Sequence, residues 1–129
     1  MNGSVLLDTN IIIAFFANDE AVTQSLSRAL QVFVPSIVLG ELHYGALYSG
    51  NPRKNTERVL EFAQHITVLN CDDHTAQVYA SIKNALRRKG TPIPENDIWI
   101  AAIAVQYTLA LATRDAHFDA VDGVTLLKW

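Results

Sequence analysis

The sequence predicts an α/β fold of three layers, in which a central parallel sheet of about five strands lies between two layers of helices. Short apolar segments alternate along the chain with longer stretches of helical pattern, as they do in strand–helix–strand units. These apolar segments lie too far apart for hairpins, so the connections should be right-handed crossovers between parallel strands. No linker or repeat interrupts the 129 residues, which we expect to form a single domain, 1–129.

Five segments have the composition and length of strands. The first is a continuous aliphatic run that ends at Asp8, as expected of a strand that is buried on both faces of a sheet. We therefore place Asp8 where the central strand ends. In chain order, the predicted strands are residues 5–7, 31–34, 66–69, 109–113 and 124–127.

The predicted helices begin with residues that favour helix N-termini. Asn10 is the expected cap of the first helix. Pro35 and Ser36 open the third, with Ser36 as its expected cap. Asp72 begins the longest helix, and Gly90 should end it. The predicted helices are residues 10–17, 18–30, 35–49, 55–64, 72–89 and 95–107, with a short one at 116–119.

Composition excludes several classes of protein. Half of the residues are apolar, which rules out a disordered chain, yet no apolar run reaches the roughly 18 residues of a membrane span. The N-terminus lacks the pattern of a secretory signal, so we expect a cytoplasmic protein with no membrane association. Cys71 is the only cysteine and has no partner for a disulfide or a zinc pair. With a formal net charge of −3, a nucleic-acid partner would have to bind a local basic patch.

Four acidic residues from distant parts of the chain are expected at one edge of the sheet. In open parallel sheets, ligands bind outside the carboxyl ends of the strands. Asp8 ends the first predicted strand, and Asp115 follows the fourth. Glu41 and Asp97 lie near the starts of crossover helices, which run antiparallel to the strands and therefore begin at the same edge. The topology thus predicts that all four carboxylates lie together.

Clustered carboxylates without a dedicated lysine or arginine repel one another, by roughly 4 kcal/mol for two unit charges about 4 Å apart at an effective dielectric near 20. Oxygen ligands of this kind favour a hard cation, Mg²⁺ or Mn²⁺. Such an ion activates water and stabilises an in-line displacement at phosphorus. Each acid also has an ordinary structural explanation. Asp8 and Asp115 can be turn or cap residues, and Glu41 and Asp97 can be solvated or dipole-compensating helix residues.

Sequence motifs surround each of the four acids. They are residues 7–10 (LDTN), Glu41 and Leu42 with Gly45, residues 94–102 (PENDIWIAA) and residues 113–118 (TRDAHF). Together these motifs resemble those of the PIN-domain ribonucleases, and most of all the VapC-type toxins of bacterial and archaeal toxin–antitoxin pairs. The resemblance spans almost the whole chain. The motifs that contain Asp97 and Asp115 are specific, whereas the motif at Asp8 alone is weak.

The resemblance implies an endoribonuclease that depends on Mg²⁺ or Mn²⁺, and a homodimer that a cognate antitoxin protein holds inactive. Asp8, Glu41 and Asp97 match the family's three principal acids. Asp115 matches the fourth, and Thr113 matches a hydroxyl position near the metal. No acidic position of the family pattern is missing, which implies a complete catalytic site acting on RNA, with tRNA or rRNA as the expected target.

Other functions are open to this sequence. PIN domains also serve in RNA processing without a toxin role, and the fold can persist as a non-catalytic interaction module, which the loss of an acid would indicate. Phosphoryl-transfer domains with an aspartyl nucleophile also begin with an acid at a strand end. However, haloacid-dehalogenase-like phosphatases need a second acid where this chain has Asn10, and receiver domains need one where it has Asn70.

A basic cluster, formed by Arg87, Arg88 and Lys89, ends the longest predicted helix. Cations in the last turn of a helix compensate its dipole, and the same side chains are able to contact RNA phosphates. The sequence alone leaves both interpretations open.

The predicted helix 95–107 is apolar nearly all round, which indicates that it is covered on more than one side. Sheet contacts account for part of this surface, and we expect a partner subunit to cover Trp99 and Ile103, which favours a homodimer. We interpret His117 as a structural hydrogen-bonding residue rather than a general base, and Cys71 as a buried residue at a strand end.

Overall fold

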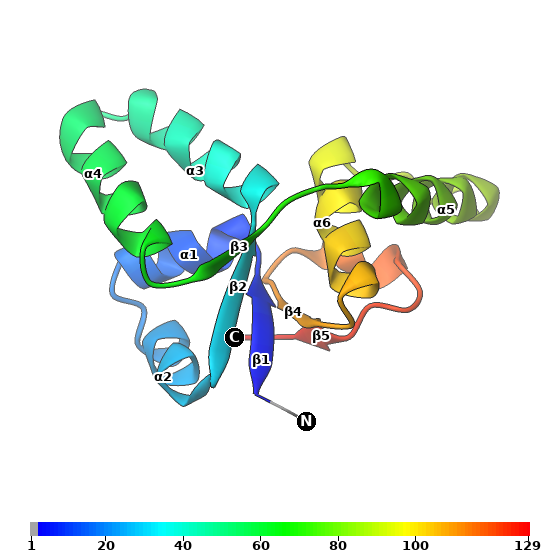
Figure 1. The fold of residues 1–129 in the computed structure, drawn as a ribbon, viewed down its shortest axis with the longest axis horizontal. Coiled ribbons are helices and arrows are strands. Elements are labelled where there is room, and N and C mark those ends of the chain that lie inside the picture. Colours follow the sequence, from blue (N-terminus) through cyan, green and yellow to red (C-terminus); the bar gives the residue numbers. More distant parts are fainter. Residues whose placement is uncertain (1–2) are drawn as a thin grey trace.

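The computed structural model describes residues 3–129 and confirms the predicted three-layer α/β/α fold. All five strands are parallel and form one sheet with the order β3-β2-β1-β4-β5. The strands are β1 (Ser4–Leu7), β2 (Gln31–Pro35), β3 (Thr67–Leu69), β4 (Ala110–Ala112) and β5 (Leu126–Leu127). In Figure 1, α3 leaves the upper edge of the sheet and α6 begins there. This is the edge at which the strands end.

Helices connect the strands at both faces of the sheet (Figure 1). Helix α4 begins at Pro52 rather than residue 55, because proline suits the first helical position and Asn51 caps the helix by accepting a hydrogen bond from the Lys54 N–H. The helices are α1 (Thr9–Phe16), α2 (Glu20–Arg28), α3 (Ser36–Leu47), α4 (Pro52–Ala63), α5 (Asp73–Lys89) and α6 (Glu95–Gln106), with a short 3₁₀-helix η1 (Ala116–Ala120).

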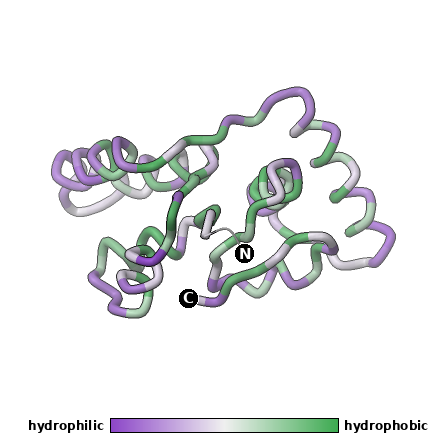
Figure 2. The backbone as a smooth tube through the Cα atoms, turned by 60° about the horizontal axis from the view of Figure 1, so that its bottom comes forward, coloured by the Kyte–Doolittle hydropathy of each residue, from purple (hydrophilic) through white to green (hydrophobic). Residues whose placement is uncertain are grey.

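The core is built around β1, the central strand. Its side chains Val5, Leu6 and Leu7 are buried, and its neighbours β2 and β4 pair with it in parallel register. The chain is hydrophobic along its central segments and more hydrophilic along the outer helices (Figure 2). Apolar burial on both faces of β1 therefore fixes the strand that leads into Asp8.

Two helix caps differ from the predicted ones. The Asp8 carboxylate caps α1, because its Oδ1 accepts a hydrogen bond from the Thr9 N–H at 2.8 Å. Asn10 is therefore not the cap and already lies inside the helix. Similarly, Ser36 is the first residue of α3 and not its cap, since Pro35 occupies the cap position and α3 has no capping side-chain hydrogen bond.

Helix α6 is covered largely within the chain. Ile103 is fully buried, and the Trp99 ring stacks on Tyr79 of α5 with 3.9 Å between ring centroids and 11° between planes. The expectation that a partner subunit covers Ile103 is therefore wrong, because this side chain is already fully buried within one chain. A homodimer stays a prediction, without support from this helix.

The C-terminal end of α5 has the charge distribution that helix dipoles favour. Arg87, Arg88 and Lys89 lie in its last turn, and Gly90 ends the helix in the left-handed conformation at φ 70°. Lys89 is engaged within the chain, because its Nζ donates to the Ala120 carbonyl at 2.6 Å. The dipole interpretation therefore accounts for the positions of these cations.

Two further properties concern surface and membrane. Cys71 is exposed rather than buried, because β3 ends at Leu69 and the chain has left the sheet before the thiol. Within residues 3–129 we find no helix with the length and apolar character that crossing a membrane requires.

The N-terminus of α5 provides a test of the fold. The Asp72 carboxylate accepts hydrogen bonds from the Thr75 N–H at 2.9 Å and from Gln106 Nε2 at 3.1 Å, which ties α5 to the end of α6. Asp72→Ala should therefore lower the free energy of unfolding by about 1–2 kcal/mol, measured by denaturant unfolding. Asp73→Ala is the matched control and should cost only a few tenths of a kcal/mol through the helix dipole. Equal effects of the two changes would contradict the capping role.

Candidate active site

The Asp8 carboxylate lies at the end of β1 and is only 4% exposed. Both of its oxygens are hydrogen-bonded: Oδ1 accepts from the Thr9 N–H at 2.8 Å, and Oδ2 accepts from the Thr113 hydroxyl at 2.7 Å. Burial raises the pKa of Asp8 above its usual range, and these two hydrogen bonds oppose the rise. The fold thus holds a carboxylate in one orientation, at an electrostatic cost.

Glu41 approaches Asp8 from the second turn of α3. Its Oε1 accepts a hydrogen bond from the Thr9 hydroxyl at 2.7 Å. Thr9 therefore contacts two of the predicted acids, Asp8 through its N–H and Glu41 through its hydroxyl. The negative charges of Asp97 and Glu41 also contribute to the raised pKa of Asp8, as expected of carboxylates gathered at one edge of the sheet.

Asp97 and Asp115 meet at His117. The His117 Nδ1 lies 3.0 Å from Asp97 Oδ2 and 3.0 Å from Asp115 Oδ1. Asp115 also caps η1, because it accepts a hydrogen bond from the His117 N–H at 2.9 Å. Burial raises the pKa of Asp97, the contact with His117 lowers it, and the charges of Asp115 and Glu41 raise it further. The Asp97 carboxylate in turn raises the pKa of His117.

Thr113 connects two of the acids from a fully buried position. Its backbone N–H donates to the Leu127 carbonyl at 3.1 Å, which extends the pairing of β4 with β5 past the strand ends. Its hydroxyl donates to Asp8 and accepts from the Asp115 N–H at 3.0 Å. Through these two hydrogen bonds, the Thr113 hydroxyl links the Asp8 side chain to the Asp115 backbone.

The structure therefore brings Asp8, Glu41, Asp97 and Asp115 to the carboxyl edge of the sheet, as the topology predicts. Sequence reasoning missed Thr9, and its place directly after a strand-ending acid was the available signal. His117 is a hydrogen-bonding residue, as expected. Its partners, however, are two of the four acids, and only the turn of η1 brings its ring back toward them.

The surrounding backbone is held by a second set of polar contacts. Asn10 accepts a hydrogen bond from the Arg114 N–H at 3.2 Å. The Arg114 side chain points away from the acids, because its guanidinium pairs with Asp19 at 3.0 Å and donates to the Trp129 carbonyl at 2.7 Å. Asn10 thus fixes the start of α1 against the segment that carries Asp115.

The donor set fits a hard divalent cation. Asp97, Asp115 and His117 each offer a ligand atom, and these atoms lie within 4.8 Å of one another. In the part of the chain that the structure describes, no lysine or arginine forms a salt bridge with any of the four acids, and His117 is their sole ionic partner. Carboxylate oxygens without a permanent counter-charge are the ligands that Mg²⁺ and Mn²⁺ prefer.

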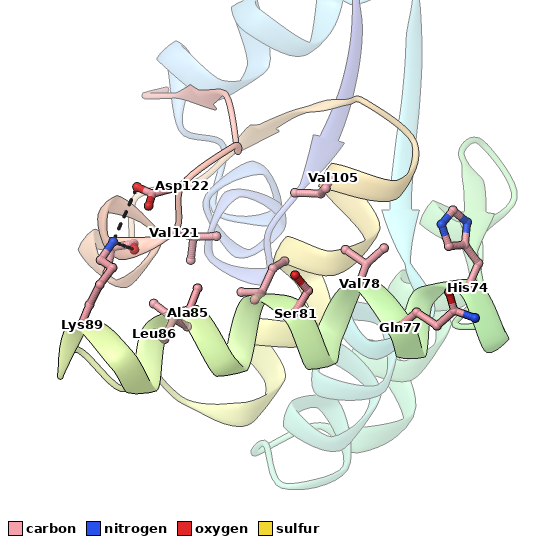
Figure 3. A pocket seen from close by; sticks show the side chains of 12 residues that line it. His74, Gln77, Val78, Ser81, Ala85, Leu86, Lys89, Val105, Val121 and Asp122 are labelled. Carbon is pink, nitrogen blue, oxygen red and sulfur yellow. Dashed lines mark hydrogen bonds and ion pairs between the residues drawn. The ribbon is translucent and has the colours of Figure 1, made fainter.

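Two hollows on the surface differ in whether residues of the acid-rich edge line them. A depression of about 580 Å³ adjoins the site at Glu41. A different hollow, of about 390 Å³, runs along α5, and Figure 3 shows Lys89 and Asp122 paired at one end of it. None of the four acids lines the α5 hollow, whose walls are mostly apolar. The depression lined by Thr9 and Glu41 therefore adjoins the site, and the α5 hollow does not.

An α/β/α domain with this acid-bearing edge is a PIN domain. The PIN-domain family model matches residues 5–124, and the chain belongs to this family. Its curated relatives within the family include VapC ribonucleases. Ribonuclease VapC2 of Haemophilus influenzae is 32% identical over 127 residues, with 96% of each chain covered. Ribonuclease VapC5 of Mycobacterium tuberculosis is 31% identical over 128 residues, covering 95% of this chain and 91% of that one.

Solved structures agree with the sequence relatives. The fold matches DNA-bound VapBC from Salmonella typhimurium with a TM-score of 0.91 and 30% identity, covering 98% of both chains. It also matches VapBC-5 from Mycobacterium tuberculosis with a TM-score of 0.79 and 29% identity, covering 98% of this chain and 99% of that one. The resemblance to VapC-type PIN domains is thereby confirmed.

Asp97→Asn tests whether the carboxylates share one electrostatic site. Because the pKa of Asp97 is raised in the folded protein, the stability of the wild type should fall as pH rises from the ordinary pKa of Asp through the raised value. The Asp97→Asn variant has no ionisable group at this position, so its stability should not fall in this way. In chelator at neutral pH it should be more stable than wild type by about 1–3 kcal/mol, and the difference should vanish below the ordinary pKa.

Thermal unfolding in chelator and in millimolar Mg²⁺ measures this effect. Added Mg²⁺ should stabilise the wild type more than the variant, because an ion that binds only the native state stabilises it by mass action. Glu95→Gln is the matched control in the same helical turn. Glu95 is exposed and pairs with Lys83 at 2.9 Å, so its neutralisation should give no gain in stability. If the Asp97→Asn variant melts below wild type in chelator, Asp97 does not belong to the group of mutually repelling carboxylates.

Proposed function

We propose that this chain is a metal-dependent endoribonuclease that acts as the toxin of a toxin–antitoxin pair and hydrolyses phosphodiester bonds of RNA. The observation that carries this proposal is the convergence of Asp8, Glu41, Asp97 and Asp115 without a lysine or arginine partner among the described residues. The expected target is a tRNA or an rRNA, and the tRNA alternative is supported by one relative, the tRNA(fMet)-specific endonuclease VapC of Salmonella typhimurium, which is 32% identical over 127 residues. The expected location is the cytoplasm.

Each residue of the site has a proposed role. Asp8, Glu41, Asp97 and Asp115 would hold the cation. A bound Mg²⁺ or Mn²⁺ supplies a water of lowered pKa and neutralises charge that develops on the phosphate. Thr113 is a positioning residue in this proposal, because its hydroxyl donates to Asp8 and accepts from the Asp115 N–H.

Asp8→Asn provides the test of this mechanism. The variant should lose RNA cleavage, because the buried Asp8 carboxylate is the acid held by two hydrogen bonds at the centre of the edge. It should keep the fold, since an asparagine oxygen caps a helix about as well. Cleavage of tRNA and rRNA is measured with Mg²⁺ or Mn²⁺ and with chelator. Asp73→Asn, an acidic residue of α5 outside the site, is the control with unchanged activity.

Two results would contradict the metal mechanism. Cleavage that continues unchanged in excess chelator would remove the requirement for a cation. Wild-type activity in Asp8→Asn would remove the central acid from the reaction. Circular dichroism and thermal unfolding of the variant separate a catalytic loss from a loss of fold.

The antitoxin is proposed to cover the approach to the site. A groove of about 360 Å³ between α1, α3 and α4 reaches Glu41. Most of its lining is apolar, and Arg58 lies beside it. An antitoxin segment in this groove would bury apolar surface at the entrance to the carboxylates. The solved relatives from Salmonella typhimurium and Mycobacterium tuberculosis, both VapBC assemblies, support the existence of such a partner.

Ile13→Asp should weaken antitoxin binding. Ile13 lines the groove and is 56% exposed. The substitution therefore places a charge in the apolar contact surface and not in the protein core. Leu60→Asp is the matched control, because Leu60 is 52% exposed on α4 and does not line the groove. Calorimetry with the cognate antitoxin measures the affinity of both variants. Equal affinities for the two variants would place the antitoxin elsewhere.

A homodimer remains part of the proposal. Sedimentation at micromolar concentration tests it directly. A monomer across that range would refute the dimer and leave the catalytic proposal untouched, because all four acids belong to one chain.

A further inference from the structure

Two tyrosines, Tyr44 on α3 and Tyr48 at its C-cap, are exposed to solvent next to the candidate active site. Tyr44 is 68% exposed and Tyr48 is 83% exposed. Their rings stack with 6.0 Å between centroids and 15° between planes. Large exposed aromatic side chains mark binding surfaces more often than they stabilise a fold. Both residues are more than two-thirds exposed, so the pair buries little surface within the chain.

Tyr44 lies in the depression that adjoins the acids. It follows Glu41 by three residues on the same helix, which places both on one side of α3. Residues that line the depression with Tyr44 come from α1, α3 and α6, and include Thr9, Glu41 and Asn96. A molecule bound at the carboxylates is therefore within reach of the tyrosine ring.

The ring arrangement leaves one face of Tyr44 available. Side chains on a helix lean toward its N-terminus, so the Tyr48 ring lies over Tyr44 and the Tyr44 ring lies toward Gly40. Gly40 has no side chain, and a Cβ built there would meet no atom within 4 Å. Tyr44 thus stacks with Tyr48, and the space beside Gly40, one turn before it on α3, is open.

The charges of the depression select the chemistry of its occupant. Its described lining contains one ionisable group of negative charge, Glu41, and neither lysine nor arginine. A phosphate group has no cationic partner there. An uncharged, flat nucleobase suits this environment, because stacking on an aromatic ring requires no counter-charge and tolerates any base.

We propose that Tyr44, backed by Tyr48, is a stacking platform for a nucleobase of single-stranded RNA that flanks the phosphate at the four-carboxylate site. This inference rests on the proposed function and names how the substrate is held. Bases of a duplex are already stacked and paired, whereas bases of loops and ends are free to stack on aromatic side chains. The platform therefore selects unpaired RNA.

A second copy of this chain is the competing occupant of the tyrosine pair. In a two-fold dimer the same patch meets itself. Such a contact centred on Tyr44 would bring the Glu41 side chains of two subunits close together, with no lysine or arginine in the lining to offset them. The charge of the depression therefore favours an uncharged base over the same surface of another subunit.

The test is binding of a fluorescein-labelled, unstructured oligoribonucleotide in millimolar Ca²⁺, a hard cation that binds carboxylate oxygens and so offsets their repulsion of the RNA phosphates, measured by anisotropy. Tyr44→Ala should weaken binding by about tenfold, and Tyr44→Phe should restore it because the phenyl face is retained. Tyr107→Ala is the matched control, since Tyr107 is 42% exposed at the C-terminal end of α6, away from the carboxylates. A duplex of the same sequence should lose the difference between wild type and Tyr44→Ala.

Several results would overturn the platform. They are wild-type affinity in Tyr44→Ala, an equal loss in Tyr107→Ala, and no binding of the oligoribonucleotide by the wild type. Dissociation of a wild-type dimer by Tyr44→Ala in sedimentation would assign the pair to a subunit contact instead. RNA cleavage by the wild type with Mg²⁺ is scored separately. Intact cleavage with no effect of Tyr44→Ala refutes the platform alone, and absent cleavage refutes the proposed function.

Discussion

The buried carboxylate of Asp8 is the constraint around which the rest of the site is arranged. An ionised group 4% exposed at the end of an apolar strand must be compensated, and two hydrogen bonds, from the Thr9 N–H and the Thr113 hydroxyl, supply part of that compensation. The same two residues also hold other acids of the site. The Thr9 hydroxyl donates a hydrogen bond to Glu41, and the Thr113 hydroxyl accepts one from the Asp115 N–H.

These contacts give the site its electrostatic character. The positions of the acids are set by backbone elements, so their mutual repulsion cannot relax by moving them apart. His117 offsets the charge of Asp97 and Asp115, whereas the charges of Glu41 and Asp97 still act on Asp8. An edge that retains negative charge in this way favours a divalent cation and disfavours bare phosphate, so under the proposed function the affinities for the cation and for the RNA backbone would be linked.

The fold and the four acids were predictable from the sequence because both follow from topology. Once apolar runs alternate with helices, parallel strands and their carboxyl edge are determined, and Asp8, Glu41, Asp97 and Asp115 fall there by position. The helix caps were not predictable in this way. Asp8, Thr9 and Asn10 are all able to cap a helix, and only the exact turn of the chain after β1 decides among them.

Side-chain packing was harder to predict than backbone topology. The apolar surface of α6 indicated burial, which is correct, but periodicity does not say whether the covering element belongs to the same chain. Tyr79 of α5 covers Trp99 from about twenty residues away, a contact that no local pattern encodes. His117 illustrates the same limit, because its partner Asp97 lies on another element.

The hydrogen bond between Thr113 and Asp8 joins residues that are 105 positions apart in the chain. During synthesis, which proceeds from the N-terminus, the acid at the end of β1 is made 105 residues before its partner hydroxyl, and Asp115 follows shortly after that hydroxyl. A ribosome-bound chain therefore carries an incomplete set of acids until β4 and the segment after it have emerged. Truncated products that lack this segment cannot assemble the site, so the order of synthesis delays any activity of the site until this segment has emerged.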